Sequence, residues 1–322
     1  MQFIFDMAKL ESLLSLRQMR YFASVVEQKG FTAAADFCAV AQPSLSRHVA
    51  QLEEALGERL LLRSRSGVEP TESGWKVYHQ VRQVLEQVNA MSAVAHGQAP
   101  EPEGRVSVAV PATSSGVMVS ELIQACHRQF PKIDLHINEG LSQMTNSVLT
   151  SGLVDFGVVP NADEVQGVVS EPLLFEWLYL LRPAQDEVHY SPTVTLAELC
   201  ALPLVMPTRE THLRRCVEHA AIDAGLRLNI RYEQRSQGII SAFVRAGVAM
   251  SVGNWPSVIT NFDTARIVAQ RIVDPGLGRT ISLAFPEQRP LSQASQAVYR
   301  LTKEIVAQAV KEGRWRGNWL QD

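Results

Sequence analysis

The N-terminal part of the chain is organised around the segment AQPSLSRHVAQLEEALGERLLLRSRSG, residues 41–67. Its apolar residues Leu45, Val49 and Leu52 recur at steps of three and four, which is typical of the buried face of a helix. Pro43 suits the first turn of that helix, because no backbone N–H is needed there. The start of the segment is polar and its end alternates Arg with Ser. The segment therefore predicts a helix followed by a basic hairpin.

Two further helices are expected before this one. The stretch LRQMRYFASVVEQK, residues 16–29, carries its own apolar stripe, and Gly30 stops it. Thr32 is expected to cap a short second helix that ends near Cys38. A tight turn at 39–41 leads into the third helix. Three helices with a tight turn between the second and third predict a helix-turn-helix.

In a helix-turn-helix the last helix enters the major groove of DNA, led by its N-terminal residues. Gln pairs with adenine, Arg with guanine, and Ser with a base or a phosphate. The residues at the front of the third helix have these types: Gln42, Ser44, Ser46 and Arg47. Two short strands around Ser66-Gly67 would form a wing whose Arg63 and Arg65 face phosphates or the minor groove. The alternative is a plain three-helix core with a solvated hairpin.

A long helix is expected from Thr71, its cap, to about residue 95. Apolar residues at alternating three- and four-residue steps predict a coiled-coil seam and therefore a dimer. The seam consists of Tyr78, Val81, Leu85 and Val88, continued by Ser92 and Ala95. The alternative is a helix that packs on its own domain.

The whole chain has 322 residues, which predicts two or three compact units. Its net charge of −3 does not favour nucleic acid, so a DNA site depends on where the cations cluster. No apolar run approaches the roughly 20 residues that span a bilayer. The four Cys are scattered without a CxxC pair, which predicts a cytoplasmic chain with reduced thiols and no structural zinc.

The segment GQAPEPEG, residues 97–104, is a linker and a domain boundary. Beyond it, expected strands such as VSVAV and VDFGVV alternate with expected helices, one of them from Ser115 to Gln129. This alternation predicts an α/β fold with a mostly parallel sheet. The pattern occurs twice, with a long crossover through EWLYLLRP, which indicates two lobes.

The residues RQMRYFASVVEQKGFTAAADFCAVAQPSLSRHVAQLEEALGERLLLRSRSGVEPTESG resemble the N-terminal signature of LysR-type transcriptional regulators. Within that family the chain looks most like the branch that contains the nitrogen assimilation control protein. PATSS, SGLVDFGVV and VRAGVAMSV extend the likeness more loosely. Departures include Leu62 where an aromatic residue is usual, and Ala249 where a second Gly is expected.

The resemblance implies a winged helix-turn-helix, a linker helix and a two-lobed α/β effector domain similar to a type 2 periplasmic binding protein. The corresponding ranges are 1–70, 71–97 and 105–322, with lobe I at about 105–176 and 277–322 and lobe II at about 177–276. The implied partners are double-stranded DNA, a small organic anion, a second copy in a homodimer or homotetramer, and RNA polymerase. No cofactor, metal, membrane or enzymatic activity is expected.

By resemblance, residues of two sets contact these partners. DNA is contacted by Thr32, Gln42, Pro43, Ser44, Ser46, Arg47, Arg63 and Arg65. The effector is contacted in the cleft between the lobes by Thr113, Ser114, Ser115, Ser142, Pro207, Thr208, Arg209, His212, Ser236 and Gln237.

Hydroxyl groups at the starts of helices favour an anionic effector, because free backbone N–H groups and the helix dipole attract negative charge. Alternatively, Ser142 only caps its helix and Arg209 points to solvent. Cys200 and Cys216 allow a thiol-responsive regulator, although neither lies in an activating motif. An enzyme is disfavoured, because the sequence has no GxSxG, HExxH, Walker A or GxGxxG motif. A solute-binding protein would lack the N-terminal helices.

Overall fold

The computed structural model describes residues 14–64, 67–95, 101–184, 189–262 and 266–321. The chain divides between Glu101 and Pro102 into two compact units. Within the described residues, no helix combines the length and apolar character needed to cross a membrane.

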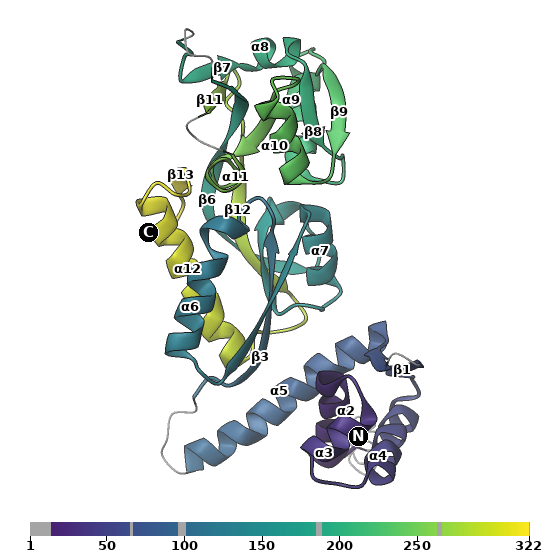
Figure 1. Ribbon diagram of the computed structural model, residues 1–322. Helices are drawn as coiled ribbons and strands as arrows, with labels where there is room; N and C mark the ends of the chain where they lie inside the picture. Colours follow the sequence, from purple (N-terminus) through teal and green to yellow (C-terminus); the bar gives the residue numbers. More distant parts are fainter. Residues whose placement is uncertain (1–13, 65–66, 96–100, 185–188, 263–265, 322) are drawn as a thin grey trace, which may run out of the picture. The chain divides into compact units, whose positions relative to one another are not determined.

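The first unit is a winged helix-turn-helix followed by a long helix (Figure 1). Its elements are α2 (Leu16–Gln28), α3 (Phe31–Phe37), α4 (Gln42–Leu56), β1 (Leu61–Ser64), β2 (Gly67–Pro70) and α5 (Glu72–Ala95). Helix α4 begins at Gln42 as expected and ends at Gly57, whose φ of 69° is left-handed. Such a φ favours glycine, which explains why the helix ends there.

The expected cap of the second helix is wrong. Helix α3 begins at Phe31, and the residue at its N-cap is Gly30. Thr32 therefore lies inside the first turn, where it is exposed. The helix begins at Phe31 because the ring of this residue is buried in the core of the unit.

One apolar core joins the three short helices to the long one. Phe22, Leu45 and Val49 are fully buried in it. Tyr78 and Val81 of α5 belong to the same core, with exposed fractions of 1% and 4%. Helix α5 is therefore anchored to its own domain along its N-terminal half.

The wing is fixed to the helices by polar contacts with the backbone. The Glu53 carboxylate accepts hydrogen bonds from the backbone N–H groups of Leu60 and Leu61, at 2.8 and 3.1 Å. Thr71 caps α5, accepting a hydrogen bond from the N–H of Gly74 at 2.9 Å. A Cβ on Gly74 would lie 1.9 Å from the Leu60 carbonyl oxygen, so only glycine fits.

The second unit has two lobes that share one large sheet (Figure 1). Lobe I contains β3 (Gly104–Pro111), η1 (Ser115–Val117), α6 (Val119–Gln129), β4 (Ile133–Gly140), α7 (Ser142–Thr150), β5 (Phe156–Pro160), η2 (Ala162–Glu164), β12 (Gly278–Pro286), α12 (Gln293–Lys311) and β13 (Gly317–Trp319). Lobe II contains β7 (Thr193–Thr195), α8 (Leu196–Ala201), β8 (Leu204–Pro207), α9 (His212–Asp223), β9 (Ile230–Gln234), α10 (Gln237–Arg245), β10 (Ser251–Asn254), α11 (Trp255–Asn261) and β11 (Ile267–Val273).

Strand β6 (Val168–Pro183) runs through both lobes, where the sequence predicted a crossover. Up to Trp177 it pairs with β12, and from Leu178 it pairs with β10 and β11. All of these pairings are antiparallel, whereas β3 pairs in parallel with β4 and β5. The large sheet is therefore mixed, and the expectation of a mostly parallel sheet is wrong. The reason is that the chain crosses between the lobes on long antiparallel strands.

The helix expected from Ser115 is also interrupted. Residues Ser115–Val117 form a single 3-10 turn, and the α-helix begins only at Val119. Val117 and Met118 turn into the core of lobe I, with exposed fractions of 5% and 1%. Burying these two side chains favours the break.

Candidate functional site

The N-terminal turn of α4 presents a polar surface. Leu45, Val49 and Leu52 are buried behind it. The residues at its front are exposed, apart from the half-buried Ser46: Gln42, Pro43, Ser44 and Arg47. Because the apolar face of α4 is buried, the helix that carries these side chains is held in place within the unit.

The wing places a second cation beside helix α3. The guanidinium of Arg63 stacks over the Phe31 ring, 4.4 Å from its centroid. The N–H of Val68 donates a hydrogen bond to the Lys29 carbonyl at 3.1 Å, which ties the wing to the end of α2. The structure therefore brings Arg63 close to the start of α3, where Thr32 is exposed. Arg65 lies outside the described residues.

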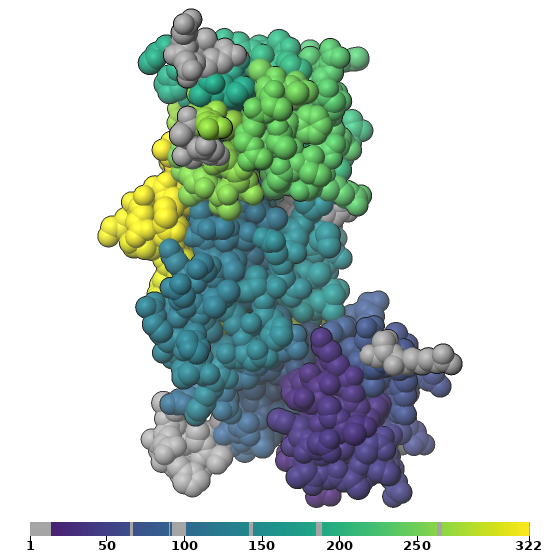
Figure 2. Space-filling model, in the orientation of Figure 1, coloured from purple at the N-terminus to yellow at the C-terminus, as the bar shows by residue number. Residues whose placement is uncertain are grey.

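The second site lies between the lobes of the second unit, where strands β3, β4 and β8 end. Loops after strand ends are where open α/β sheets bind ligands. The residues that line this cleft are Pro111, Ala112, Thr113, Gly140, Leu141, Pro207, Thr211, Leu213, Gln237 and Arg279. The cavity they enclose is about 20 Å³, enough for a single water molecule. Figure 2 shows the two lobes in contact on the visible face.

Arg279 is the cation of the cleft. It is 3% exposed, and its Nη2 donates to Thr113 Oγ1 at 3.4 Å. Its Nε donates to Glu176 Oε1 at 2.6 Å. Among the described residues, no acceptor is within hydrogen-bond distance of Nη1. Arg279 therefore has a donor left for a ligand.

Glu176 holds Arg279 in position. This carboxylate is completely buried, and its Oε2 accepts hydrogen bonds from Asn254 Nδ2 at 2.9 Å and Trp315 Nε1 at 2.7 Å. Asn254 comes from lobe II and Trp315 from the C-terminal segment of lobe I. A buried charge needs a partner and hydrogen bonds, and Glu176 has both. The guanidinium in the cleft is thus fixed by contacts from both lobes.

Two family models match the chain. Residues 16–75 match the bacterial regulatory helix-turn-helix protein of the lysR family, and residues 99–307 match the LysR substrate binding domain. The chain belongs to the LysR family. It is a DNA-binding transcriptional regulator with an effector-binding domain, not an enzyme.

Similar proteins support this assignment over nearly the whole chain. The nitrogen assimilation regulatory protein nac of Escherichia coli (strain K12) is 28% identical over 94% of this chain and 98% of its own length. A full-length OxyR variant from Pseudomonas aeruginosa has a TM-score of 0.73 at 22% identity, covering 96% of this chain and 99% of its own. Full-length CbnR in complex with its target DNA has a TM-score of 0.54 at 23% identity, covering 91% and 99%. The nac likeness agrees with the branch that the sequence indicated.

In this LysR effector domain, the structure brings together only some of the expected effector residues. Thr113, Pro207 and Gln237 line the cleft. The hydroxyls of Ser114 and Ser115 stay within lobe I. Ser114 Oγ donates to the Pro111 carbonyl at 3.2 Å, and Ser115 Oγ donates to the Glu139 carboxylate. Residue Ser142 begins α7, but its side chain lies outside those that the structure describes.

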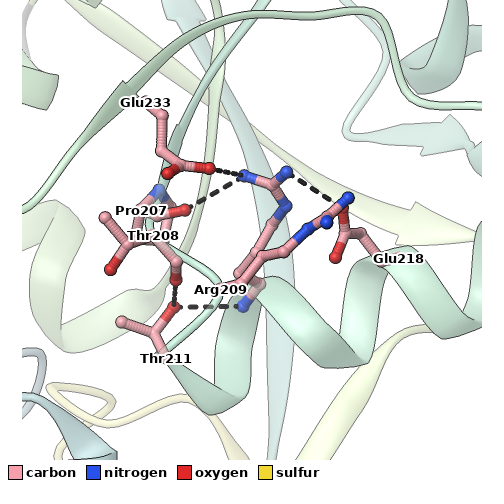
Figure 3. Close-up of polar contacts among 7 residues, drawn as sticks. Pro207, Thr208, Arg209, Thr211, Glu218 and Glu233 are labelled. Atoms are coloured by element: carbon pink, nitrogen blue, oxygen red, sulfur yellow. Dashed lines mark hydrogen bonds and ion pairs between the residues drawn. The ribbon is translucent and has the colours of Figure 1, made fainter.

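The structure contradicts the assignment of Arg209 to the cleft (Figure 3). Its side chain is 77% exposed and pairs with Glu218 of α9, Nη2 to Oε1 at 3.2 Å. Glu218 also accepts from the buried Arg214 at 2.9 Å. Because this carboxylate attracts both guanidinium groups, Arg209 pairs with α9 and is not part of the cleft lining.

The remaining expected residues of lobe II are not part of the cleft lining. Thr208 has a buried hydroxyl oxygen without a hydrogen-bond partner among the described residues, and Ser236 is exposed at the start of α10. His212 is buried, and its Nε2 lies 3.5 Å from Glu164 of lobe I. Burial and the Arg279 charge lower the pKa of His212, although Glu164 opposes this shift.

Sequence reasoning missed Arg279, Glu176 and the two donors that hold Glu176. One signal was present. Glu176 stands inside LLFEWLYLL, an otherwise apolar strand. A carboxylate in such a run is rarely buried unless it is paired, so the run indicated a hidden cation.

The expected dimer seam needs correction. Tyr78 and Val81 cannot form it, because they are buried in the core of their own domain. Farther along α5 the apolar side chains are exposed to solvent: Val84, Val88 and Met91 are 39%, 38% and 70% exposed. Leu85 packs partly against the core.

The cysteines have no activating surroundings among the described residues. All four are free. Burial raises the pKa of the Cys126, Cys200 and Cys216 thiols, and a raised pKa disfavours the reactive thiolate. For Cys216, the Arg279 charge acts against this shift.

Proposed function

We propose that this LysR regulator is controlled by a small organic carboxylate bound in the cleft, with Arg279 and Thr113 as its polar contacts. The observation that carries this proposal is the buried guanidinium of Arg279 in the cleft lining, with a donor left over. Guanidinium groups suit carboxylates because they offer paired donors in a fixed plane. Apolar lining such as Leu141 and Leu213 would contact the rest of the ligand.

The size of the cavity indicates how such a ligand would act. A space of about 20 Å³ admits no organic acid, so the ligand requires a more open arrangement of the lobes. A ligand shifts an equilibrium only through its different affinity for the two arrangements. The effector would therefore stabilise a different angle between lobes I and II, and change operator binding through it.

On the DNA side, the exposed front of α4 would read bases in the major groove. Gln42 and Arg47 would supply the bidentate pairs to bases, with Ser44 and Ser46 beside them. Arg63, Arg65 and Thr32 would contact phosphates, which adds affinity without sequence preference.

The dimer would form through the exposed stripe of α5. Val84, Val88 and Met91 recur at steps of four and three, which is the spacing of a helix-pair interface. A second copy would cover these side chains and set the separation of the two recognition helices. Assembly to tetramers would use the effector domains.

The effector proposal is tested by substituting Thr113. A thermal-shift screen of small carboxylates identifies a ligand, and operator affinity is then measured by fluorescence anisotropy with and without it. Thr113→Val should reduce the ligand's effect on operator affinity by roughly 1.5–3 kcal/mol, the value of a hydrogen bond to a charged group. Affinity for the operator without ligand should not change.

Thr150→Val is the matched control, because Thr150 is exposed and its hydroxyl bonds only to carbonyls of its own helix, those of Asn146 and Ser147. Ser114→Ala should also have little effect, since that hydroxyl is bonded to Pro111. If Thr113→Val responds to the ligand as wild type does, the cleft assignment fails.

A further inference from the structure

A second cavity of the effector domain lies beside strand β6, at the point where this strand passes between the lobes. Its volume is about 240 Å³. It is lined by Phe175, Trp177, Arg271, Ile272, Val273, Gly276 and Leu277. None of these residues lines the cleft. We call this cavity the hinge pocket.

The hinge pocket and the ion pair of Glu176 are on opposite faces of β6. Successive side chains of a strand point to opposite faces. Phe175 and Trp177 therefore lie on one face, whereas Glu176 between them points to Arg279 on the other. A ligand in the hinge pocket would occupy a site separate from the cleft.

The chemistry of the lining suits one class of ligand. Two aromatic rings and three aliphatic side chains line the pocket together with a single cation, the solvent-exposed Arg271. Its guanidinium stacks over Trp177, 5.0 Å from the ring centroid, and no carboxylate of the described residues forms an ion pair with it. Apolar walls with one charged group are typical of small-molecule sites.

We propose that the hinge pocket binds a small carboxylate with a flat apolar body. The carboxylate pairs with Arg271, and the body packs against Trp177 and Phe175. The volume is below the range of drug-sized sites, which selects a ligand of about one ring. In the present arrangement of the lobes the cleft is too small for such a molecule, whereas the hinge pocket is not.

The position of the pocket gives its occupant a route to the cleft. Trp177 directly follows Glu176, and Leu277 stands two residues before Arg279. Gly278, which lies between Leu277 and Arg279, packs so closely against Phe175 that a Cβ on it would lie 2.4 Å from the Phe175 ring. An occupant therefore contacts the segments on both sides of the Glu176–Arg279 ion pair, and would favour the lobe arrangement in which these segments keep their present spacing.

The test is a calorimetric titration of the full-length chain with benzoate and, separately, with benzamide. Benzamide has nearly the same shape as benzoate but no charge. We expect benzoate to bind wild type and to bind Arg271→Gln at least about tenfold more weakly, a loss of about 1.4 kcal/mol. Benzamide should bind wild type as weakly as benzoate binds that variant. Arg271→Lys, which keeps the charge, should be intermediate.

Two further variants separate the hinge pocket from other sites. Arg231→Gln removes an exposed arginine elsewhere in lobe II and should bind benzoate like wild type. Thr113→Val should also bind like wild type, because Thr113 lies in the cleft. The proposal is overturned if benzoate does not bind wild type, or if Arg271→Gln binds it unchanged. Loss of binding in Thr113→Val also overturns it, and would support the cleft site of the proposed function instead.

Discussion

The substitution Glu176→Gln probes the buried network that holds the cleft cation. It keeps the shape of the side chain but removes its charge. Glu176 accepts from Arg279 through one oxygen and from Asn254 and Trp315 through the other. A glutamine has one acceptor oxygen and one NH2 group. Its NH2 group would therefore face another donor, either that of Arg279 or those of Asn254 and Trp315. The guanidinium of Arg279 also remains buried without a counter-charge.

The expected loss of stability is large. Removing one partner of a buried ion pair costs about 3–5 kcal/mol, because the remaining charge is uncompensated. For a unit the size of residues 102–322, each kcal/mol lowers Tm by about 2–4 °C. Glu176→Gln should therefore lower the Tm of the effector domain by roughly 6–20 °C.

The assay is differential scanning calorimetry of the full-length chain. Glu210→Gln is the matched control, because Glu210 forms an exposed ion pair with Arg235, with side chains 47% and 70% exposed. Such pairs contribute about 1 kcal/mol or less. The double substitution Glu176→Gln with Arg279→Met should be less damaging than Glu176→Gln alone, since it removes the unpaired guanidinium while the glutamine oxygen still accepts from Asn254 and Trp315. If Glu176→Gln costs no more than Glu210→Gln, the network does not hold Arg279 as described.

Three further predictions concern the wing, the pH response and the dimer. Gly74→Ala should lower the free energy of unfolding of the first unit in urea by more than about 1 kcal/mol, because its Cβ would meet the Leu60 carbonyl. At Gly57 an alanine Cβ would meet no neighbouring atom, and Gly57→Ala would only strain a left-handed φ. Burial holds the pKa of His212 below its usual 6.5, so its contribution to stability is present above pH 6.5 and is lost as the pH falls through the folded-state pKa. His212→Asn should therefore make Tm depend less on pH below pH 6.5. His219→Asn, at an exposed histidine, should leave that dependence unchanged. Val88→Asp with Met91→Asp should give a monomer by analytical ultracentrifugation, and an unchanged dimer would place the interface elsewhere.

The winged helix-turn-helix could be predicted because its signals are local. Helix α4 follows from the steps between Leu45, Val49 and Leu52, and its limits follow from Pro43 and Gly57. The surface against which α5 packs could not be predicted from the sequence, for a physical reason. An apolar stripe has the same spacing whether it is buried in its own domain or against a partner, so Tyr78 and Val81 were assigned to the wrong surface.

The cleft could be predicted only in outline. The alternation of strands and helices places Thr113 and Pro207 after strand ends, and the structure has both in the lining. The pairing of Glu176 with Arg279 joins residues 103 positions apart, which no local pattern reveals. The assignment of Arg209 to the ligand was wrong for a similar reason. Its guanidinium pairs instead with Glu218, which is too far along the sequence for a local pattern to reveal the pair.

The most direct test of the account is whether Gln42 at the front of α4 reads DNA sequence. The measurement is a fluorescence anisotropy titration of the full-length chain on the DNA upstream of its own gene and on a scrambled duplex. Gln42→Ala should lower the ratio of the two affinities by the equivalent of roughly 1–3 kcal/mol, while Gln51→Ala, an exposed glutamine on the same helix, should leave it unchanged. An unchanged ratio for Gln42→Ala would contradict the assignment of α4 as the recognition helix.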